Sequence, residues 1–309
     1  MRILFMGTPD FAVPCLKILI ENGHGVCGAV TQPDRPKGRG HKLMAPPVKV
    51  CAESNGIPGF QPQSLKNDEL LPVLEELKPE LIIVVAYGKI LPEYILNFPK
   101  YGCVNVHASL LPKYRGAAPI QWSVINGDKT TGVTTMYMEK GLDTGDMIFK
   151  SSTEIGDRET YGELHDRLSE MGAELLIKTV SAISGGTAPR EKQNDDESCY
   201  APMISKETGH IDWSRPSDEV LNLIRGTNPW PMSYTMYGDE VLKIITAEDG
   251  GGGASGDCGS ISVRNKKLFI TCGGGTSIAA DEIQFKGGKR MRFADYLNGH
   301  TIDESIILK

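Results

Sequence analysis

Two polar side chains at the end of one predicted strand have the types and the spacing that acyl transfer needs. In Gly102–His107, valines at 104 and 106 alternate with Asn105 and His107, as in a strand with two unlike faces. Residues two apart in an extended strand project to the same side, so Asn105 and His107 emerge together where the strand ends. An amide can donate hydrogen bonds to a developing oxyanion, and histidine titrates near neutrality. The pair therefore predicts chemistry in which an amine attacks a carbonyl carbon, although a strand-end histidine also fits a purely structural role.

A carboxylate in the segment Gly141–Asp146 is the candidate third member of this site. Asp143 lies between two glycines, in a turn that precedes a predicted strand. A carboxylate beside a histidine orients the imidazole and fixes its tautomer. Asp146 is close enough in sequence to take this place, and either aspartate could instead stabilise its own turn through an Asx-type hydrogen bond. Spacing alone does not decide between the two.

The elements that must position these residues alternate along the first part of the chain, in the order typical of a parallel α/β sheet. Short apolar segments predict strands at Arg2–Met6, Gly25–Thr31, Leu81–Ala86 and Gly102–His107, and two segments that alternate like antiparallel strands follow at Thr130–Met138 and Asp146–Ser152. Helices are predicted at Phe11–Asn22, Pro47–Asn55, Pro119–Gly127 and Thr160–Ser184. The predicted fold is therefore α/β, with a Rossmann-like, mostly parallel sheet.

A second domain is predicted after a polar, charged segment at 185–197, which reads as a linker. Beyond it, glycine turns separate short predicted strands, and Arg215–Arg225 is the one clear helix. The glycine runs Gly250–Gly253 and Gly273–Gly275 are expected to be flexible turns. This pattern predicts a small OB-like β-barrel. The predicted boundaries are 1–188 for the first domain, 189–206 for the linker and 207–309 for the second domain.

Cationic side chains gather in two segments, although the formal net charge of the chain is −6. Gln32–Pro47 is predicted to be a loop too interrupted by proline and glycine for regular structure, and a loop of this length is usually functional. Five cations and no acid occur between Arg35 and Lys49: Arg35, Lys37, Arg39, Lys42 and Lys49. A second acid-free group comprises Lys286, Lys289, Arg290 and Arg292. Both groups suit contact with RNA phosphates, and both also fit an exposed, solubilising surface.

Several other classes of protein are disfavoured by the motifs that are absent. The turn Gly7–Ala12 has only the first glycine of a dinucleotide fingerprint, and Pro9 removes an N–H donor that a phosphate would need. Seven cysteines without C-x-x-C or zinc spacing predict no metal site and reduced thiols. The N-terminus lacks the apolar core of a signal peptide, and the longest apolar run is too short for a membrane span. We therefore expect a cytoplasmic location and no membrane partner.

The same residues carry a resemblance to a known family. Asn105-Val106-His107, followed by Ser109–Pro112 and Tyr114–Trp122, resembles the folate-dependent formyltransferases. Other segments are similar to the same family, namely Gly7–Ala12, Thr31–Gly40, Ala86–Pro92, Gly141–Asp146 and Asn228–Pro231. The likeness covers nearly the whole chain, and its motifs are long and mutually spaced.

The resemblance implies a catalytic trio of Asn105, His107 and Asp143, which favours Asp143 over Asp146. The implied reaction moves the formyl group of 10-formyltetrahydrofolate to the α-amino group of methionine on initiator methionyl-tRNA, for translation initiation, without a metal. Direct attack of the amine on the formyl carbon is implied, with no covalent enzyme intermediate. Implied folate contacts, largely through backbone groups near the pteridine ring, lie at Ser109, Leu110, Leu111, Pro112, Tyr87, Gly88 and Ile90.

The resemblance also gives the cationic segments a role. RNA contacts are implied at Arg35, Lys37, Arg39 and Lys42, and we expect further contacts at Lys289 and Arg290. Arg39 matches the arginine that would probe the end of the acceptor stem. The expected protein is a monomer whose residues 207–309 bind tRNA. The alternative is a formyltransferase that uses the same trio on an amino-sugar nucleotide or a ribonucleotide. A non-catalytic RNA-binding protein is disfavoured because the whole trio is present.

Overall fold

The computed structural model describes residues 1–37 and 42–309, which separate into two compact units. The first unit comprises Met1–Pro119, Thr130–Thr153 and His165–Ala201, and the second comprises Ile120–Lys129, Glu154–Leu164 and Pro202–Lys309. The predicted domain boundaries at 188 and 206 remain predictions. Within the described residues, no helix has the length and apolarity that crossing a membrane requires.

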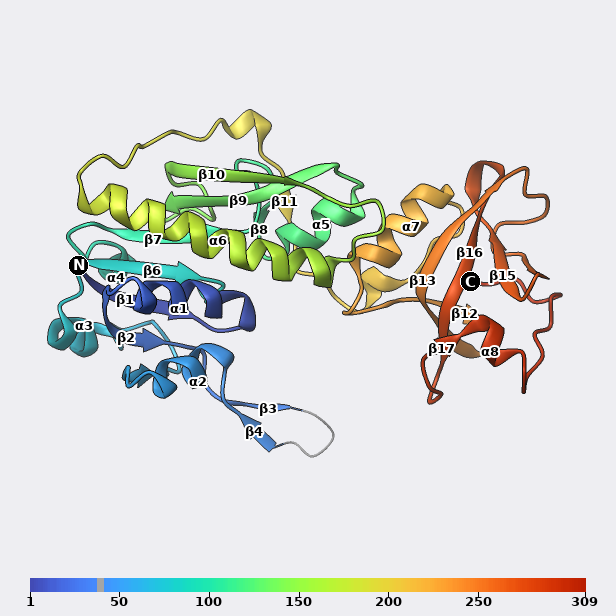
Figure 1. Cartoon of the computed structure of the whole chain (residues 1–309), viewed down its shortest axis with the longest axis horizontal. Helices are drawn as coiled ribbons and strands as arrows, with labels where there is room; N and C mark the ends of the chain where they lie inside the picture. Colours follow the sequence, from blue (N-terminus) through green and yellow to red (C-terminus); the bar gives the residue numbers. More distant parts are fainter. Residues whose placement is uncertain (38–41) are drawn as a thin grey trace. The chain divides into compact units, whose positions relative to one another are not determined.

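The first unit is built on a seven-stranded sheet with the order β10-β9-β7-β6-β1-β2-β5 (Figure 1). The strands β5, β2, β1, β6 and β7 are parallel, and β9 is antiparallel to β7. The mostly parallel sheet that the sequence predicts is therefore confirmed. The strand bounds are β1 Arg2–Gly7, β2 Gly25–Val30, β5 Gly59–Phe60, β6 Leu81–Val85, β7 Cys103–His107, β9 Thr130–Tyr137 and β10 Met147–Glu154.

Helices cover both faces of this sheet. Leu74 of α3 and Ile95 of α4 join a core with Leu4 and Ile82 of the central strands on one face. On the other face, Gly172 of α6 lies close against Val106 of β7. Prolines occupy the first turns of α1, α2 and α3, where a missing N–H costs no helical hydrogen bond. The helices with residues in this unit are α1 Val13–Glu21, α2 Pro47–Ser54, α3 Leu71–Leu77, α4 Glu93–Leu96, α5 Pro119–Ile125 and α6 Tyr161–Ser184, with short 3-10 turns η1 Asp10–Ala12 and η2 Asp195–Glu197.

The segment predicted as an irregular loop at 32–47 contains two short strands instead. Strand β3 (Arg35–Lys37) pairs antiparallel with β4 (Lys42–Met44), and Pro36 lies opposite Leu43. Three residues are too few for a readable alternation, and proline in a run argues against a strand except at an edge. The irregular-loop prediction is therefore wrong for these residues, and we call them the β3–β4 pair.

Residues 193–201 return to the first unit. Strand β11 (Tyr200–Ala201) pairs in parallel with β8 (Arg115–Gly116), the next strand after β7 in sequence. These two strands form a small sheet of their own. Part of the segment predicted as linker, 189–206, is therefore attached to the first unit through backbone hydrogen bonds.

The second unit is a mainly antiparallel sheet with the order β12-β13-β16-β15-β14, and β17 pairs with β16. Its core includes Trp213, Leu242, Ile270 and Phe293, together with Val220 and Ile224 of α7. The antiparallel sheet is confirmed, and closure into an OB-like barrel stays a prediction. The bounds are β12 Ser233–Tyr237, β13 Glu240–Gly252, β14 Ile261–Arg264, β15 Lys267–Thr271, β16 Thr276–Phe285, β17 Met291–Arg292, α7 Ser217–Gly226, α8 Phe293–Tyr296, η3 Glu207–Gly209 and η4 Gly273–Gly275.

The glycine run at 250–253 was expected to be a flexible turn, and this expectation is wrong for most of the run. Strand β13 continues through Gly252, with Gly251 opposite Ser277 of β16. Pairing with the neighbouring strand outweighs the weak intrinsic strand preference of glycine here.

Candidate active site

Strand β7 brings Asn105 and His107 to one face of the sheet, as the alternation predicts. Asn105 lies in register with Val84 of β6 and Met136 of β9, and His107 lies opposite Thr134 of β9. Because β7 is paired on both sides, neither side chain can change face without shifting two registers.

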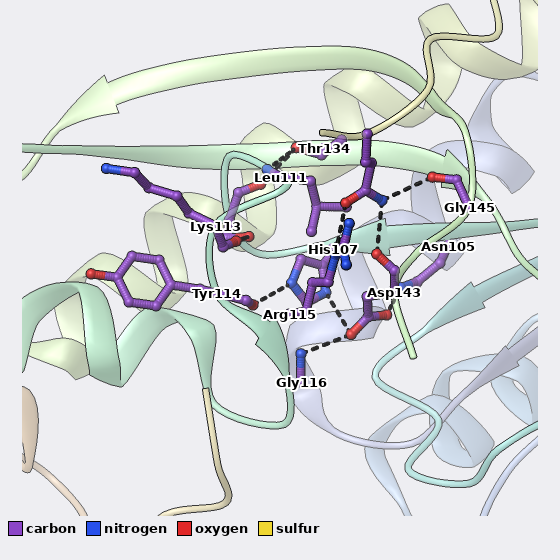
Figure 2. A network of polar contacts seen from close by, with 12 residues as sticks. Asn105, His107, Leu111, Lys113, Tyr114, Arg115, Gly116, Thr134, Asp143 and Gly145 are labelled. Carbon is purple, nitrogen blue, oxygen red and sulfur yellow. Dashed lines mark hydrogen bonds and ion pairs between the residues drawn. The ribbon is translucent and has the colours of Figure 1, made fainter. Parts of the chain in front are cut away.

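His107 is held between a backbone carbonyl and a carboxylate. The residue is 5% exposed, and its Nε2 lies 2.9 Å from the carbonyl oxygen of Tyr114. A carbonyl oxygen only accepts hydrogen bonds, so this contact assigns the proton to Nε2. The other ring nitrogen, Nδ1, lies 3.7 Å from Oδ2 of Asp143. Figure 2 shows the ring between these two partners.

Asp143 completes the group from a turn with a left-handed backbone conformation, φ +51°. Its Oδ2 accepts a hydrogen bond of 2.9 Å from the backbone N–H of Gly116, and Asn105 Nδ2 donates to Oδ1 at 3.4 Å (Figure 2). Asn105 and His107 therefore each contact Asp143, the residue to which the resemblance joins them. Asp146 lies elsewhere, with Oδ2 3.5 Å from Arg190 Nη1.

The segment Ser109–Pro112, predicted to contact folate, follows β7 directly and is fixed by Thr134. Thr134 Oγ1 donates to the carbonyl of Ser109 at 2.7 Å and accepts from the N–H of Leu111 at 3.1 Å. The Ser109 hydroxyl donates to the Lys113 carbonyl at 2.6 Å, and the Leu111–Pro112 peptide bond is cis. Leu110 is the half-buried member of the segment, and the other three are buried.

The second predicted folate segment borders a pocket at the carboxyl ends of β1, β2 and β6. Tyr87 and Gly88 line this pocket of about 320 Å³, whose size is within the range of small-molecule sites, ~300–1,000 Å³. Ile90 is 79% exposed and is not one of the lining residues. The full lining comprises Thr8, Pro9, Gln32, Pro33, Arg35, Met44, Pro46, Ala86, Tyr87 and Gly88.

The backbone of Tyr87, and not its side chain, is presented toward the polar residues of this pocket. Its carbonyl accepts hydrogen bonds from Thr8 Oγ1 at 3.2 Å and Gln32 Nε2 at 3.1 Å. Its ring lies in the apolar core, and burial raises the pKa of the phenol to about 12. The Tyr87 side chain therefore belongs to the core, and the backbone is the part of the residue that is available to the pocket.

The cations predicted to contact RNA lie in different settings. Arg35 is exposed on β3 and lines the pocket, Lys37 and Lys42 are register partners in the β3–β4 pair, and Arg39 lies outside the described residues. In the second unit Lys289 is exposed, whereas the Arg290 guanidinium pairs with Glu282, with Nε 3.0 Å from Oε2.

A contact that sequence reasoning missed lies at the base of the β3–β4 pair. Lys49 Nζ lies 3.0 Å from both carboxylate oxygens of Asp34 and 2.7 Å from Gln61 Oε1. Gln61 Nε2 donates to Asp34 Oδ1 at 2.8 Å and to the Gln32 carbonyl at 2.9 Å. Hydrogen bonds from Gln61 and Lys49 hold the pKa of the Asp34 carboxyl below its usual range. Lys49 is thus neutralised locally, although no acid interrupts the cations in sequence.

The backbone partners of the trio, Tyr114 and Gly116, also escaped the sequence analysis because backbone groups carry no residue-type signal. No cluster of three or more histidine, cysteine, aspartate or glutamate side chains suited to a metal occurs in residues 1–37 and 42–309.

Comparison with known proteins assigns both parts of the chain. Residues 1–180 match the family model for formyl transferase, and residues 203–301 match the model for the formyl transferase C-terminal domain. The methionyl-tRNA formyltransferase of Alkaliphilus oremlandii is 51% identical over 308 residues, covering 100% of this chain and 99% of the relative. That of Caldanaerobacter subterraneus subsp. tengcongensis is 52% identical and covers 100% of both chains.

Solved structures share the fold at lower identity. The N-formyltransferase of Helicobacter canadensis, solved with folinic acid and dTDP-3-aminofucose, has a TM-score of 0.70 at 21% identity, covering 91% of this chain and 98% of that one. HypX of Aquifex aeolicus, solved with tetrahydrofolic acid, has a TM-score of 0.66 at 16% identity, covering 98% of this chain and 48% of that one. The family models and the full-length relatives establish that the chain belongs to the formyl transferase family.

Proposed function

We propose that this protein transfers the formyl group of 10-formyltetrahydrofolate to the α-amino group of methionine on initiator methionyl-tRNA. The observation that carries the proposal is the contact of Asn105, His107 and Asp143 at the end of β7. The full-length relatives at about half identity are methionyl-tRNA formyltransferases, which favours methionyl-tRNA as the acceptor. An amino-sugar nucleotide is the second acceptor class to test, because the Helicobacter canadensis enzyme was solved with one.

The trio offers a hydrogen-bond donor for the developing oxyanion and a place for the proton that the amine releases. When bound, 10-formyltetrahydrofolate supplies the formyl carbon, whose bond to N10 breaks as its bond to the amine forms, with one proton passing from the amine to N10. Asn105 Nδ2, whose contact with Asp143 is long at 3.4 Å, is free to turn a donor toward the developing oxyanion. His107 Nδ1 and Asp143 Oδ2, 3.7 Å apart, form the pair at which we place the proton taken from the amine.

The residues near the trio fit a folate. Ser109–Pro112 follows β7 next to His107, and two hydrogen bonds with Thr134 fix its backbone. The segment therefore presents a rigid surface to a ligand. The pocket bordered by Tyr87 and Gly88 has mainly apolar walls with three polar or charged residues, Thr8, Gln32 and Arg35, a composition typical of small-molecule sites. We assign folate contacts to Ser109, Leu110, Leu111, Pro112, Tyr87, Gly88 and Ile90, those of the 87–90 segment through backbone groups.

The acceptor RNA is assigned to the cationic residues. Arg35, Lys37, Arg39 and Lys42 would follow its phosphates near the active edge of the sheet, and Lys289 and Arg290 would contact it from an OB-like domain at 207–309. Residues 1–188 then form the catalytic domain, joined through 189–206. A monomer acting in the cytoplasm accords with this role.

One assay tests the reaction and its acceptor together. The full chain is incubated with 10-formyltetrahydrofolate and methionine charged on initiator tRNA, on elongator tRNA, or with an amino-sugar nucleotide. We expect formyl-methionine on the initiator only, with a rate that falls as salt rises, since phosphate contacts release counterions. Formylation of the sugar nucleotide without formylation of the initiator would overturn the proposed acceptor, and formylation of none of them would overturn the reaction.

A further inference from the structure

The segment 193–201 contacts both the segment whose Tyr114 carbonyl holds the His107 ring and the turn that carries Asp143. Cys199 carries one set of contacts: its Sγ accepts a hydrogen bond from the N–H of Tyr114 at 3.2 Å, and its carbonyl accepts from the N–H of Arg115 at 2.9 Å. Strand pairing between β11 and β8 continues this attachment. The carbonyl of Tyr114 in turn contacts His107 Nε2.

Gln193 makes the other set, and it joins the two loops directly. Its Nε2 donates to the carbonyls of Asp143 at 2.7 Å and Gly145 at 2.8 Å. Its Oε1 accepts from Arg115 Nε at 2.9 Å, and Arg115 Nη2 also pairs with Asp195 at 2.8 Å. One half-buried amide therefore ties the turn that carries Asp143 to the segment that carries Gly116.

The conformation of the turn that carries Asp143 depends on contacts from outside the turn. Asp143 has a left-handed backbone conformation that a non-glycine residue adopts only where its surroundings hold it. Gly141, Leu142 and Thr144 are exposed, so little apolar packing fixes the turn. Both N–H groups of the Gln193 amide end on carbonyls of this turn, so these bonds set where the Asp143 carboxylate lies.

We propose that Gln193 is a positioning residue, which holds the Asp143 carboxylate against the Gly116 N–H and beside His107. The inference rests on the proposed role of Asp143 in formyl transfer. A displacement of about 1 Å at a reacting group can cost up to about a hundredfold in rate. Loss of Gln193 should therefore slow the chemical step while leaving substrate binding in place.

The first test does not depend on turnover. Gly116 donates its N–H to Asp143 Oδ2, whereas the neighbouring Ala117 donates to the Ala201 carbonyl at 2.9 Å. In Gln193→Ala, we expect hydrogen exchange of the Gly116 amide, measured by NMR, to accelerate about tenfold while that of Ala117 is unchanged. Unchanged exchange at Gly116 would overturn the inference, whatever the acceptor proves to be. Equal acceleration at both amides would also overturn it, because it would report loss of the β8–β11 pairing instead.

The second test is kinetic. In Gln193→Ala we expect kcat for formylation to fall about tenfold, with both KM values within about twofold of wild type. Gln193→Glu keeps the size of the side chain and the acceptor for Arg115, but it places an oxygen against two carbonyls, so its kcat should fall at least as far. This variant replaces Gln193→Ala in the test if the alanine variant folds poorly. The matched control is Lys192→Ala, an exposed neighbour.

A double-mutant cycle separates positioning from general stability. On an Asp143→Asn background, Gln193→Ala should lower kcat by less than about twofold further, because the group that it positions is already disabled. Full additivity would overturn the inference. If Asp143→Asn alone had wild-type turnover, the proposed role of Asp143 would fail, and the exchange result at Gly116 would still stand apart from it.

Discussion

The proposed catalytic trio and the β3–β4 pair belong to the same unit but are held in different ways. His107 is buried on a strand that is paired on both sides, and Asp143 accepts a backbone hydrogen bond. In the β3–β4 pair, by contrast, Leu43 is 70% exposed, and the strands pair with each other alone in a separate two-stranded sheet. The difference indicates that the sheet fixes the proposed reacting groups, whereas the segment proposed to contact RNA is anchored mainly at its base.

That base is polar. Asp34, Lys49 and Gln61 form a closed set of hydrogen bonds immediately before β3, and Gln61 connects them to the Gln32 carbonyl beyond β2. A contact surface that pairs outside the main sheet can adapt to a nucleic acid without disturbing the proposed reacting groups. Substitutions in the trio should therefore affect kcat, and substitutions in the β3–β4 pair or its base should affect tRNA binding.

The largest expected effect is that of Asn105→Ala. Loss of one oxyanion donor typically costs roughly 3–4 kcal/mol, so we expect kcat to fall about a hundredfold or more. The KM for tRNA and the thermal midpoint should stay close to wild type, because among the residues that the structure describes the side chain makes one hydrogen bond, and that bond is long. Single-turnover kinetics with charged initiator tRNA measure the change. Near-normal turnover would remove Asn105 from the mechanism and break the division between chemistry and binding.

Sequence reasoning predicted six of the seven strands of the first sheet and missed the two-residue β5, which is too short to show a pattern. It predicted the Asn105/His107 pair because alternation along β7 is a local property. The choice between Asp143 and Asp146 is not predictable from spacing, since both lie in one turn and only tertiary contacts separate them.

Other contacts of the site leave no signal in the sequence. Tyr114 and Gly116 act through backbone groups, which no residue type reveals. The run of cations without an acid near Arg39 does not predict the ion pair of Lys49 with Asp34, because that pair depends on how the chain folds back. Likewise, the polar composition of 189–206 predicts a linker and gives no sign that Gln193 contacts the Asp143 turn.

The next effect in size concerns Arg39, which the resemblance places at the end of the acceptor stem. In Arg39→Ala, loss of one phosphate or base contact should lower kcat/KM for tRNA about tenfold, and the salt dependence of kcat/KM should become less steep. The KM for 10-formyltetrahydrofolate should not change. Steady-state kinetics at two salt concentrations provide the measurement. A lower kcat with unchanged tRNA dependence would instead place Arg39 with the catalytic residues.

A smaller effect is expected at the base of the β3–β4 pair, where charge and anchoring can be separated. Gln61→Leu removes hydrogen bonds to Asp34, Lys49 and the Gln32 carbonyl without changing the net charge. We expect the KM for tRNA to rise about threefold at unchanged kcat, the size of one or two modest hydrogen bonds. Gln63→Leu, at an exposed position two residues later, is the matched control. If kcat falls instead, the base supports the proposed reacting groups, and the two regions are not held independently.

The smallest effect is expected in the second unit, where a matched pair distinguishes contact from charge. Lys289→Gln and Arg290→Gln each remove one positive charge, so their long-range electrostatic effects on tRNA should be alike. Arg290 already donates to Glu282, whereas no ion pair of Lys289 occurs in the described part of the chain. A direct phosphate contact is therefore more accessible to Lys289, and we expect its substitution to raise the KM for tRNA about twofold and that of Arg290 to raise it less. Equal changes would mean that this cluster acts only through its field, and a larger change for Arg290 would mean that tRNA displaces Glu282.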